Sequence, residues 1–231
     1  MTLFPDMCNA FLHESIIGRA IAAGTVDVEC TDIRPFTENK HGRTDDYPYG
    51  GGRGMVMSAQ PIYDCYRAIC EKRGDTPPVI YMSPKGKVLT QQKALELSKG
   101  DGFIILCGHY EGVDQRLIDE IVDEEISIGD YVLTGGEMPA LVLTDAVCRM
   151  IGGVLSDDEC FTEESHFRGF LNILNIPVLP YGEKEIFPRF CFRAIIKTLP
   201  RGAERKCLPK RRINAPICWK MRISPKRNAF F

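Results

Sequence analysis

The sequence predicts an α/β fold built on a largely parallel β-sheet. In the first 155 of its 231 residues, short apolar runs rich in β-branched residues alternate with longer stretches that carry apolar residues at helical spacing. Parallel strands need a crossover between them, and a helix between successive strands supplies it. Strands are expected at residues 1–4, 26–33, 78–83, 102–108 and 124–133.

The stretches between these strands predict the covering helices. In the last of them Pro139 stands in the first turn, where its missing N–H costs nothing. Helices are expected at residues 9–24, 59–74, 90–100, 113–122 and 138–153. The strand at 1–4 is shorter than a typical strand of five or six residues, and a translation start placed a few residues too late would explain its length.

The composition indicates a globular cytoplasmic protein. It is 44% hydrophobic and 26% charged, no apolar run reaches the length of a membrane span, and the first residues do not resemble a signal peptide. The ten cysteines are scattered without any CxxC motif, so most of them are expected to be buried as small hydrophobic residues. The four histidines lack metal-ligand spacing, and no metal site is assigned.

Three glycine-bearing turns indicate a ligand site. "CGHYEGVDQR" (107–116) and "SIGDYVLTGGEMPAL" (127–141) each join a strand to a helix, where open α/β sheets bind ligands. "YGGGRGM" (49–55) lies in a polar loop at 36–55 and is neither a P-loop nor a dinucleotide fingerprint. It is either a flexible turn or a close approach of backbone to a flat ligand, with Arg53 contacting a phosphate or base. No acidic residue stands where a nicotinamide cofactor would need it.

Residues 2–171 resemble the bacterial tRNA (guanine-N1)-methyltransferases of the SPOUT superfamily. The resemblance rests on six segments in this order: "LFPDM", "DDYPYGGGRGMVM", "YMSPKGK", "LCGHYEGVDQR", "SIGDYVLTGGEMPALVLTDAVCRM" and "GVLSDDECFTEESHF". It implies a SPOUT-type parallel sheet with a C-terminal trefoil knot in an S-adenosylmethionine-binding domain at 1–156, an exception to the rule that chains do not thread loops. Residues 157–171 would form a linker and the start of a small helical tRNA-binding domain. Family members act as homodimers that bind the tRNA anticodon arm across both subunits and methylate the guanine 3′ of the anticodon, at position 37.

The resemblance also implies the site residues. Guanine N1 carries a proton at neutral pH, so its methylation needs a base, and Glu164 matches the acidic base of the family. Without the resemblance, Glu164 would be read as a solvated acidic residue at a helix start. Arg149 matches the residue that stabilises negative charge on guanine O6. Magnesium is a possible requirement, although the sequence shows no ligand cluster for it. The implied cofactor-binding positions are Ser83, Pro84, Gly108, Tyr110, Glu111, Ile128, Gly129, Asp130, Tyr131, Val132, Leu133, Gly135 and Gly136.

The resemblance stops after Leu171, where the charge also reverses. Residues 1–171 carry 15 Lys and Arg against 28 Asp and Glu, whereas residues 172–231 carry 14 against 3. A basic, proline-broken tail is ordinarily a disordered nucleic-acid-binding extension. However, when residues from Asn172 onward are back-translated with degenerate codons and one base is added before the Asn172 codon, the new frame can read family sequence such as Tyr-Thr-Arg-Pro and Leu-Leu-Ser-Gly-Asn-His. We therefore expect residues 172–231 to be an out-of-frame, poorly ordered translation that disrupts the small helical domain.

Three functional classes remain open at this point. The first is a tRNA (guanine-N1)-methyltransferase, and the second is another SPOUT enzyme that methylates rRNA or a tRNA ribose. The third is an inactive or weakly active relic that binds an adenosyl ligand or RNA, because the frameshift removes the domain that holds the anticodon arm.

Overall fold

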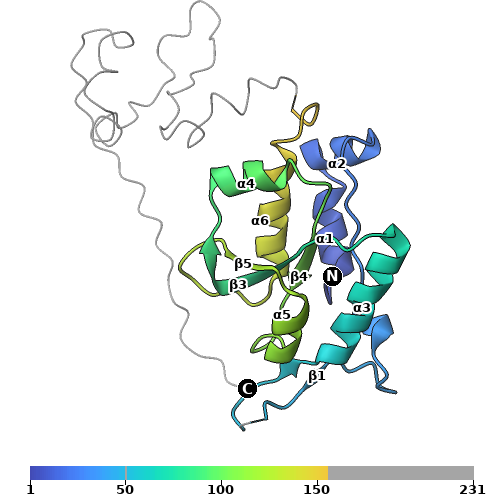
Figure 1. Cartoon of the computed structure of the whole chain (residues 1–231), viewed down its shortest axis with the longest axis vertical. Helices are drawn as coiled ribbons and strands as arrows, with labels where there is room; N and C mark the ends of the chain where they lie inside the picture. Colours follow the sequence, from blue (N-terminus) through green and yellow to red (C-terminus); the bar gives the residue numbers. More distant parts are fainter. Residues whose placement is uncertain (50, 156–231) are drawn as a thin grey trace, which may run out of the picture. The chain divides into compact units, whose positions relative to one another are not determined.

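The computed structural model describes residues 1–49 and 51–155, which build a parallel sheet between helices (Figure 1). Its strands are β3 (Val79–Val88), β4 (Ile104–Cys107) and β5 (Glu124–Ser127), in the order β4-β3-β5. Both neighbouring pairs are parallel. The expected α/β fold with a parallel sheet is therefore confirmed. The strand expected at 124–133 is shorter than predicted, because it ends at Ser127 and residues 128–133 form a turn.

Residues 1–4 and 26–33 do not form the two strands that the sequence predicted. They meet in a single parallel bridge between Thr2 and Asp32. The Thr2 N–H donates to the Thr31 carbonyl at 3.1 Å, and the Cys107 N–H donates to the Met1 carbonyl at 3.1 Å. The first residues thus lie between the segment at 31–33 and β4 and continue the hydrogen bonding of the sheet, although too few residues pair to make a strand.

The helix predicted at 9–24 is two helices, α1 (Pro5–Leu12) and α2 (Ser15–Ala22). The helical path is interrupted at residues 13–15, where Ser15 has a positive φ of 56°. Gly18 fits the bend, because a Cβ there would lie 2.4 Å from the carbonyl carbon of His13. The apolar spacing continues across the break, so the sequence pattern did not reveal it.

The other predicted helices are confirmed, with ends shifted by up to three residues, except that the helix predicted to end at 153 already ends at Cys148. They are α3 (Ala59–Arg73), α4 (Gln91–Leu97), α5 (Gln115–Ile121) and α6 (Glu137–Cys148). The 3₁₀-helix η1 (Arg34–Phe36) lies at the start of the polar loop. Within the loop, β1 (Asp45–Asp46) pairs antiparallel with β2 (Val56–Met57), which directly follows the loop.

The two faces of the sheet are covered by different helices. Successive side chains of β3 point to opposite faces. Val79 and Tyr81 belong to a buried cluster with residues of α3 and α5. Ile80 and Met82 belong to a second cluster with residues of α4 and α6 (Figure 1). This double covering explains why the strands read as nearly continuous apolar runs.

Several expectations fall on residues outside the described part of the chain. The linker at 157–171, Glu164 and the tail at 172–231 are among them, and they stay predictions together with the trefoil knot. Among the described residues, none of the helices combines the length and apolar character needed to cross a lipid bilayer.

Candidate functional site

The middle of β3 and the turns that follow β4 and β5 line one cavity of about 210 Å³. It lies at the carboxyl end of the parallel strands, where the sequence predicted a ligand site. Twelve of the thirteen expected cofactor-binding residues line it. These are Ser83, Pro84, Gly108, Tyr110, Glu111, Ile128, Gly129, Tyr131, Val132, Leu133, Gly135 and Gly136.

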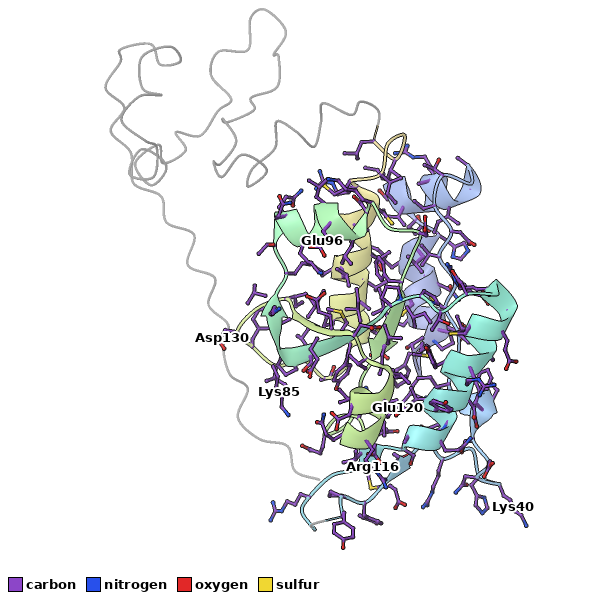
Figure 2. The ribbon with its side chains drawn as sticks, in the orientation of Figure 1. Lys40, Lys85, Glu96, Arg116, Glu120 and Asp130 are labelled. Carbon is purple, nitrogen blue, oxygen red and sulfur yellow. The ribbon has the colours of Figure 1, made fainter. Side chains whose placement is uncertain are left out.

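Asp130 is the one expected cofactor-binding residue that does not line the cavity. It is exposed, and Figure 2 shows it at the outer edge of the turn after β5. Its neighbours are held differently, because Gly129 N–H donates to Ser127 Oγ at 3.2 Å and Ser127 Oγ donates to the Gly129 carbonyl at 2.9 Å. The neighbours of Asp130 in this turn therefore line the cavity, whereas Asp130 does not.

The turn before α6 crosses the end of β4 in direct backbone contact. Gly136 N–H donates to the Gly108 carbonyl at 2.7 Å. A Cβ on Gly136 would lie 2.7 Å from the Gly108 nitrogen and 2.8 Å from the Cys107 Cα. Only glycine permits this approach without moving backbone. The two glycine-bearing turns that the sequence singled out after β4 and β5 thus form one wall.

Backbone groups and aromatic rings dominate the cavity wall. Tyr110 adopts a left-handed φ of 57° at the end of β4, a conformation uncommon for a non-glycine residue. Its side chain is 48% exposed, and that of Tyr131 is 55% exposed. Burial raises the pKa of the Tyr81 phenol, so this ring stays neutral. Such a wall suits a ligand with a flat apolar part and a polar edge.

The glycine-rich loop contacts the cavity through Glu111. A Cβ on Gly54, which has a φ of 90°, would lie 2.5 Å from the Glu111 Cγ. The Glu111 N–H also donates to the Met55 carbonyl at 3.0 Å. Gly54 therefore allows close packing against a cavity residue, while Arg53 is exposed and does not line the cavity. A contact of Arg53 with phosphate or base stays a prediction.

Arg149 lies at the far end of α6 from this cavity. Gly135 and Gly136 precede the helix and Arg149 follows it. A helix of 12 residues spans about 18 Å. Arg149 instead lines a second cavity of about 330 Å³ with residues of α1 and α6, among them Phe11 and Val142. One chain therefore does not bring Arg149 to the cofactor positions, and Glu164 lies outside the described residues.

Some cavity residues were missed by the sequence reasoning. His109 lies inside the quoted motif of the second turn, and Thr134 lies inside that of the third. Their position in the sequence between expected cofactor-binding residues was the signal that could have identified them. Within residues 1–49 and 51–155, no group of three Asp, Glu, His or Cys side chains lies close enough together to hold a metal ion.

Comparison with known proteins identifies the family. The family model described as tRNA (Guanine-1)-methyltransferase TrmD matches residues 1–182. The chain belongs to the tRNA (guanine-N1)-methyltransferase family. It is 59% identical over 171 residues to the tRNA (guanine-N(1)-)-methyltransferase of Ruminiclostridium cellulolyticum, covering 74% of this chain and 73% of that one.

Other members of the tRNA (guanine-N1)-methyltransferase family agree with this assignment. The enzyme of Clostridioides difficile is 54% identical over 166 residues, covering 71% of this chain and 72% of that one. The crystal structure of tRNA (m1G37) methyltransferase from Aquifex aeolicus superposes with a TM-score of 0.63 at 44% identity, covering 68% of this chain and 70% of that chain. The resemblance expected from the sequence is confirmed. Members of the family are S-adenosylmethionine-dependent enzymes. The names of the relatives specify guanine N1, which favours this class over a ribose methyltransferase.

Proposed function

We propose that this protein transfers the methyl group of S-adenosylmethionine to N1 of the guanine 3′ of the tRNA anticodon, at position 37. The observation that carries the proposal is the single cavity lined by twelve family cofactor positions, in a chain that belongs to the family. The name of the Aquifex aeolicus relative, which specifies m1G37, supports the choice of position.

The residues of the cavity fit an adenosyl ligand. Gly135 and Gly136 leave backbone accessible where a side chain would fill the wall, and Leu133 and Tyr131 offer apolar surface to an adenine ring. Glu111 supplies a carboxylate that can accept hydrogen bonds from ribose hydroxyls. When bound, the sulfonium cofactor supplies the electrophilic methyl group.

Two further residues complete the chemistry in this proposal. Glu164 removes the N1 proton of guanine, which makes the ring nitrogen nucleophilic. Arg149 stabilises the negative charge that grows on O6 as the proton leaves. Both assignments rest on the family match of their positions. Magnesium stays possible as an additional requirement.

We propose that the functional unit is a homodimer. Arg149 and the cofactor cavity lie at opposite ends of α6 within one chain, so a second copy offers a way to bring them together. An apolar face on α1 and α6 supports this: its members are 40–51% exposed and recur at helical spacing. They are Phe4, Met7, Phe11, Met138 and Val142.

We propose the domain organisation that the sequence predicts. Residues 1–156 form the S-adenosylmethionine domain with its trefoil knot, residues 157–171 form the linker to the tRNA-binding domain, and residues 172–231 are out of frame. The curated relatives support the last boundary, because the alignment with the Ruminiclostridium cellulolyticum enzyme spans 171 residues and 74% of this chain. The family model extends slightly further, to residue 182.

A methyl-transfer assay tests the proposal. A tRNA with guanine 3′ of the anticodon is incubated with the labelled cofactor and either this chain or a version with one base restored before the Asn172 codon. We expect label at guanine N1 with the restored chain and little or none with the present chain, which is then a weakly active relic. Label on a ribose or on rRNA alone would contradict the assigned reaction, and equal activity of the two chains would contradict the role of the frame.

A further inference from the structure

His109 presents a buried nitrogen that lacks a partner among the described residues. Its Nδ1 is shielded from solvent and accepts or donates no hydrogen bond there. A buried polar atom left unpaired destabilises the folded state, so an unpaired ring nitrogen beside a ligand cavity calls for a functional explanation. Because solvent does not reach Nδ1, this atom faces the protein interior beneath the turn rather than the open cavity.

Gly135 lies between this nitrogen and a buried carboxylate. A Cβ on Gly135 would lie 2.8 Å from His109 Nδ1 and 2.5 Å from Glu137 Oε2. The two polar atoms therefore converge on the same small space from either side of the turn. His109 and Gly135 also form an antiparallel bridge, which fixes their backbones side by side.

Glu137 is held in place by the start of the chain. Its side chain is 3% exposed, and its Oε1 accepts a hydrogen bond from Thr2 Oγ1 at 2.8 Å. Thr2 Oγ1 in turn accepts from the Phe4 N–H at 2.9 Å. A buried carboxylate is costly unless it is hydrogen-bonded, and its second oxygen is directed toward the space beside His109.

The His109 ring is itself held by aromatic contacts. It packs edge-on against Phe4 with the ring centroids 5.1 Å apart, and against Tyr110 with the centroids 4.8 Å apart. Phe4 thus contacts the imidazole through its ring and the Thr2–Glu137 pair through its backbone. The ring, the carboxylate and the first residues of the chain form one connected group beneath the cavity turn.

We propose that His109 is a positioning residue of the methyl-donor cavity, in which Nδ1 and the Glu137 carboxylate together hold the turn at Gly135. With Nδ1 protonated, the imidazole donates toward the carboxylate, directly after a small side-chain rotation or through one water molecule. The turn is thereby fixed in the shape that presents its backbone to the ligand. This inference rests on the proposed function of the cavity.

Two substitutions of His109 distinguish the contribution of Nδ1 from that of the rest of the ring. In His109→Asn the side-chain amide reaches the place of Nδ1, whereas in His109→Gln it reaches the place of Nε2. Binding of S-adenosylhomocysteine to the full chain is measured by titration calorimetry. We expect a loss on the order of tenfold in affinity for H109Q, the equivalent of one hydrogen bond, and near-complete retention by H109N.

A double-mutant cycle with Glu137→Gln tests the coupling. E137Q alone is expected to weaken binding to a similar degree, and H109Q with E137Q no more than either alone, because the two residues act as one unit. Equal affinities of H109N and H109Q, or additive losses in the double variant, would overturn the proposal. Unfolding temperatures are measured in parallel to distinguish a loss of positioning from a general loss of stability. A general loss of stability would not depend on whether the amide takes the place of Nδ1 or of Nε2.

His13→Gln is the matched control. His13 is exposed, and its Nδ1 pairs with the Asn9 carbonyl at 2.8 Å at the end of α1, so its replacement is expected to leave affinity unchanged. If the unsubstituted chain itself does not bind S-adenosylhomocysteine, the proposed function of the cavity fails instead.

Discussion

At the scale of single residues, one pair of cysteines differs from the other thiols in the described part of the chain. A hydrogen bond from Cys8 to the sulfur of Cys30 raises the pKa of Cys8 and lowers that of Cys30. Burial raises the pKa of Cys65 to about 11, of Cys107 to about 12 and of Cys148 to about 11. Since the thiolate is the reactive form, Cys30 is expected to react with iodoacetamide near pH 8 before the three buried thiols. Peptide mass spectrometry over a time course checks the order.

The control for the cysteine prediction is Cys8→Ala. It removes the donor that favours the Cys30 thiolate, so Cys30 is expected to react more slowly in this variant. Faster labelling of Cys107 than of Cys30 in the folded protein would contradict the prediction, because Cys107 is buried in the core.

Most of the residues that line the cavity could be predicted from the sequence, but not all of them. Glycines such as Gly108 and Gly136 could be predicted, because a turn at the end of a parallel strand needs close backbone approach. The position of Asp130 outside the cavity could not be predicted, since it depends on the hydrogen bonds between Ser127 and Gly129 within the turn. The role of His109 could not be predicted from the sequence either, because its buried surroundings are formed by Glu137 and the first residues of the chain.

At the scale of elements, α5 begins on a side-chain cap whose loss should be measurable. Asp114 accepts hydrogen bonds from the Arg116 N–H at 3.0 Å and from its guanidinium at 2.6 Å. Asp114→Ala is expected to lower the free energy of unfolding by about 1 kcal/mol, and Asp114→Asn by less, because the amide oxygen still accepts. Denaturant titration measures both.

The pH dependence of this cap has a defined sign. The hydrogen bonds from Arg116 lower the pKa of Asp114 below its usual value, so the stability that they add is complete above the ordinary carboxyl pKa of about 4. It is lost as the pH falls through the lowered value, and the difference between the native chain and D114A should shrink there. Arg116→Gln is the control for the ion pair, because the Arg116 side chain is 87% exposed. A loss in R116Q as large as that in D114A would contradict the backbone cap.

Elements with long periodic patterns could be predicted, whereas short or interrupted ones could not. The apolar spacing of α3 and α6 extends over three or more turns. It predicted both ends of α3 and the start of α6 to within one residue, and the end of α6 five residues too late. The break between α1 and α2 depends on contact between Gly18 and the His13 backbone, which periodicity does not register. The first residues failed as a strand because their pairing with the segment at 31–33 is one bridge long.

At the scale of the whole molecule, the apolar face on α1 and α6 predicts self-association. Val142→Glu places a charge among Phe11, Met138 and their neighbours on this face, and burying an unpaired charge is costly. We expect the variant to sediment as a monomer where the unsubstituted chain is a dimer. Tyr47→Glu, at a side chain 76% exposed beside β1, is the control and should leave the mass unchanged. A dimer that survives V142E would place the interface elsewhere.

The separation of Arg149 from the cavity predicts that each active site is shared between two chains. The Gly136→Val variant loses the cavity, because its Cβ would collide with the Gly108 backbone, and Arg149→Ala loses the charge at the other end of α6. Each alone is expected to be nearly inactive in the frame-restored chain. Co-expressed with different tags, they form mixed dimers in which the intact cavity of one chain meets the Arg149 of the other.

Purification through both tags leaves only mixed dimers, and each has one competent site of two, so about half of the unsubstituted activity should return. The measurement is methyl transfer by dimers purified through both tags, with each singly substituted homodimer assayed beside them. If a site were complete within one chain, the mixed dimer would hold a cavity without Arg149 and an Arg149 without a cavity. It would then stay as inactive as its parents, and the shared site would be refuted.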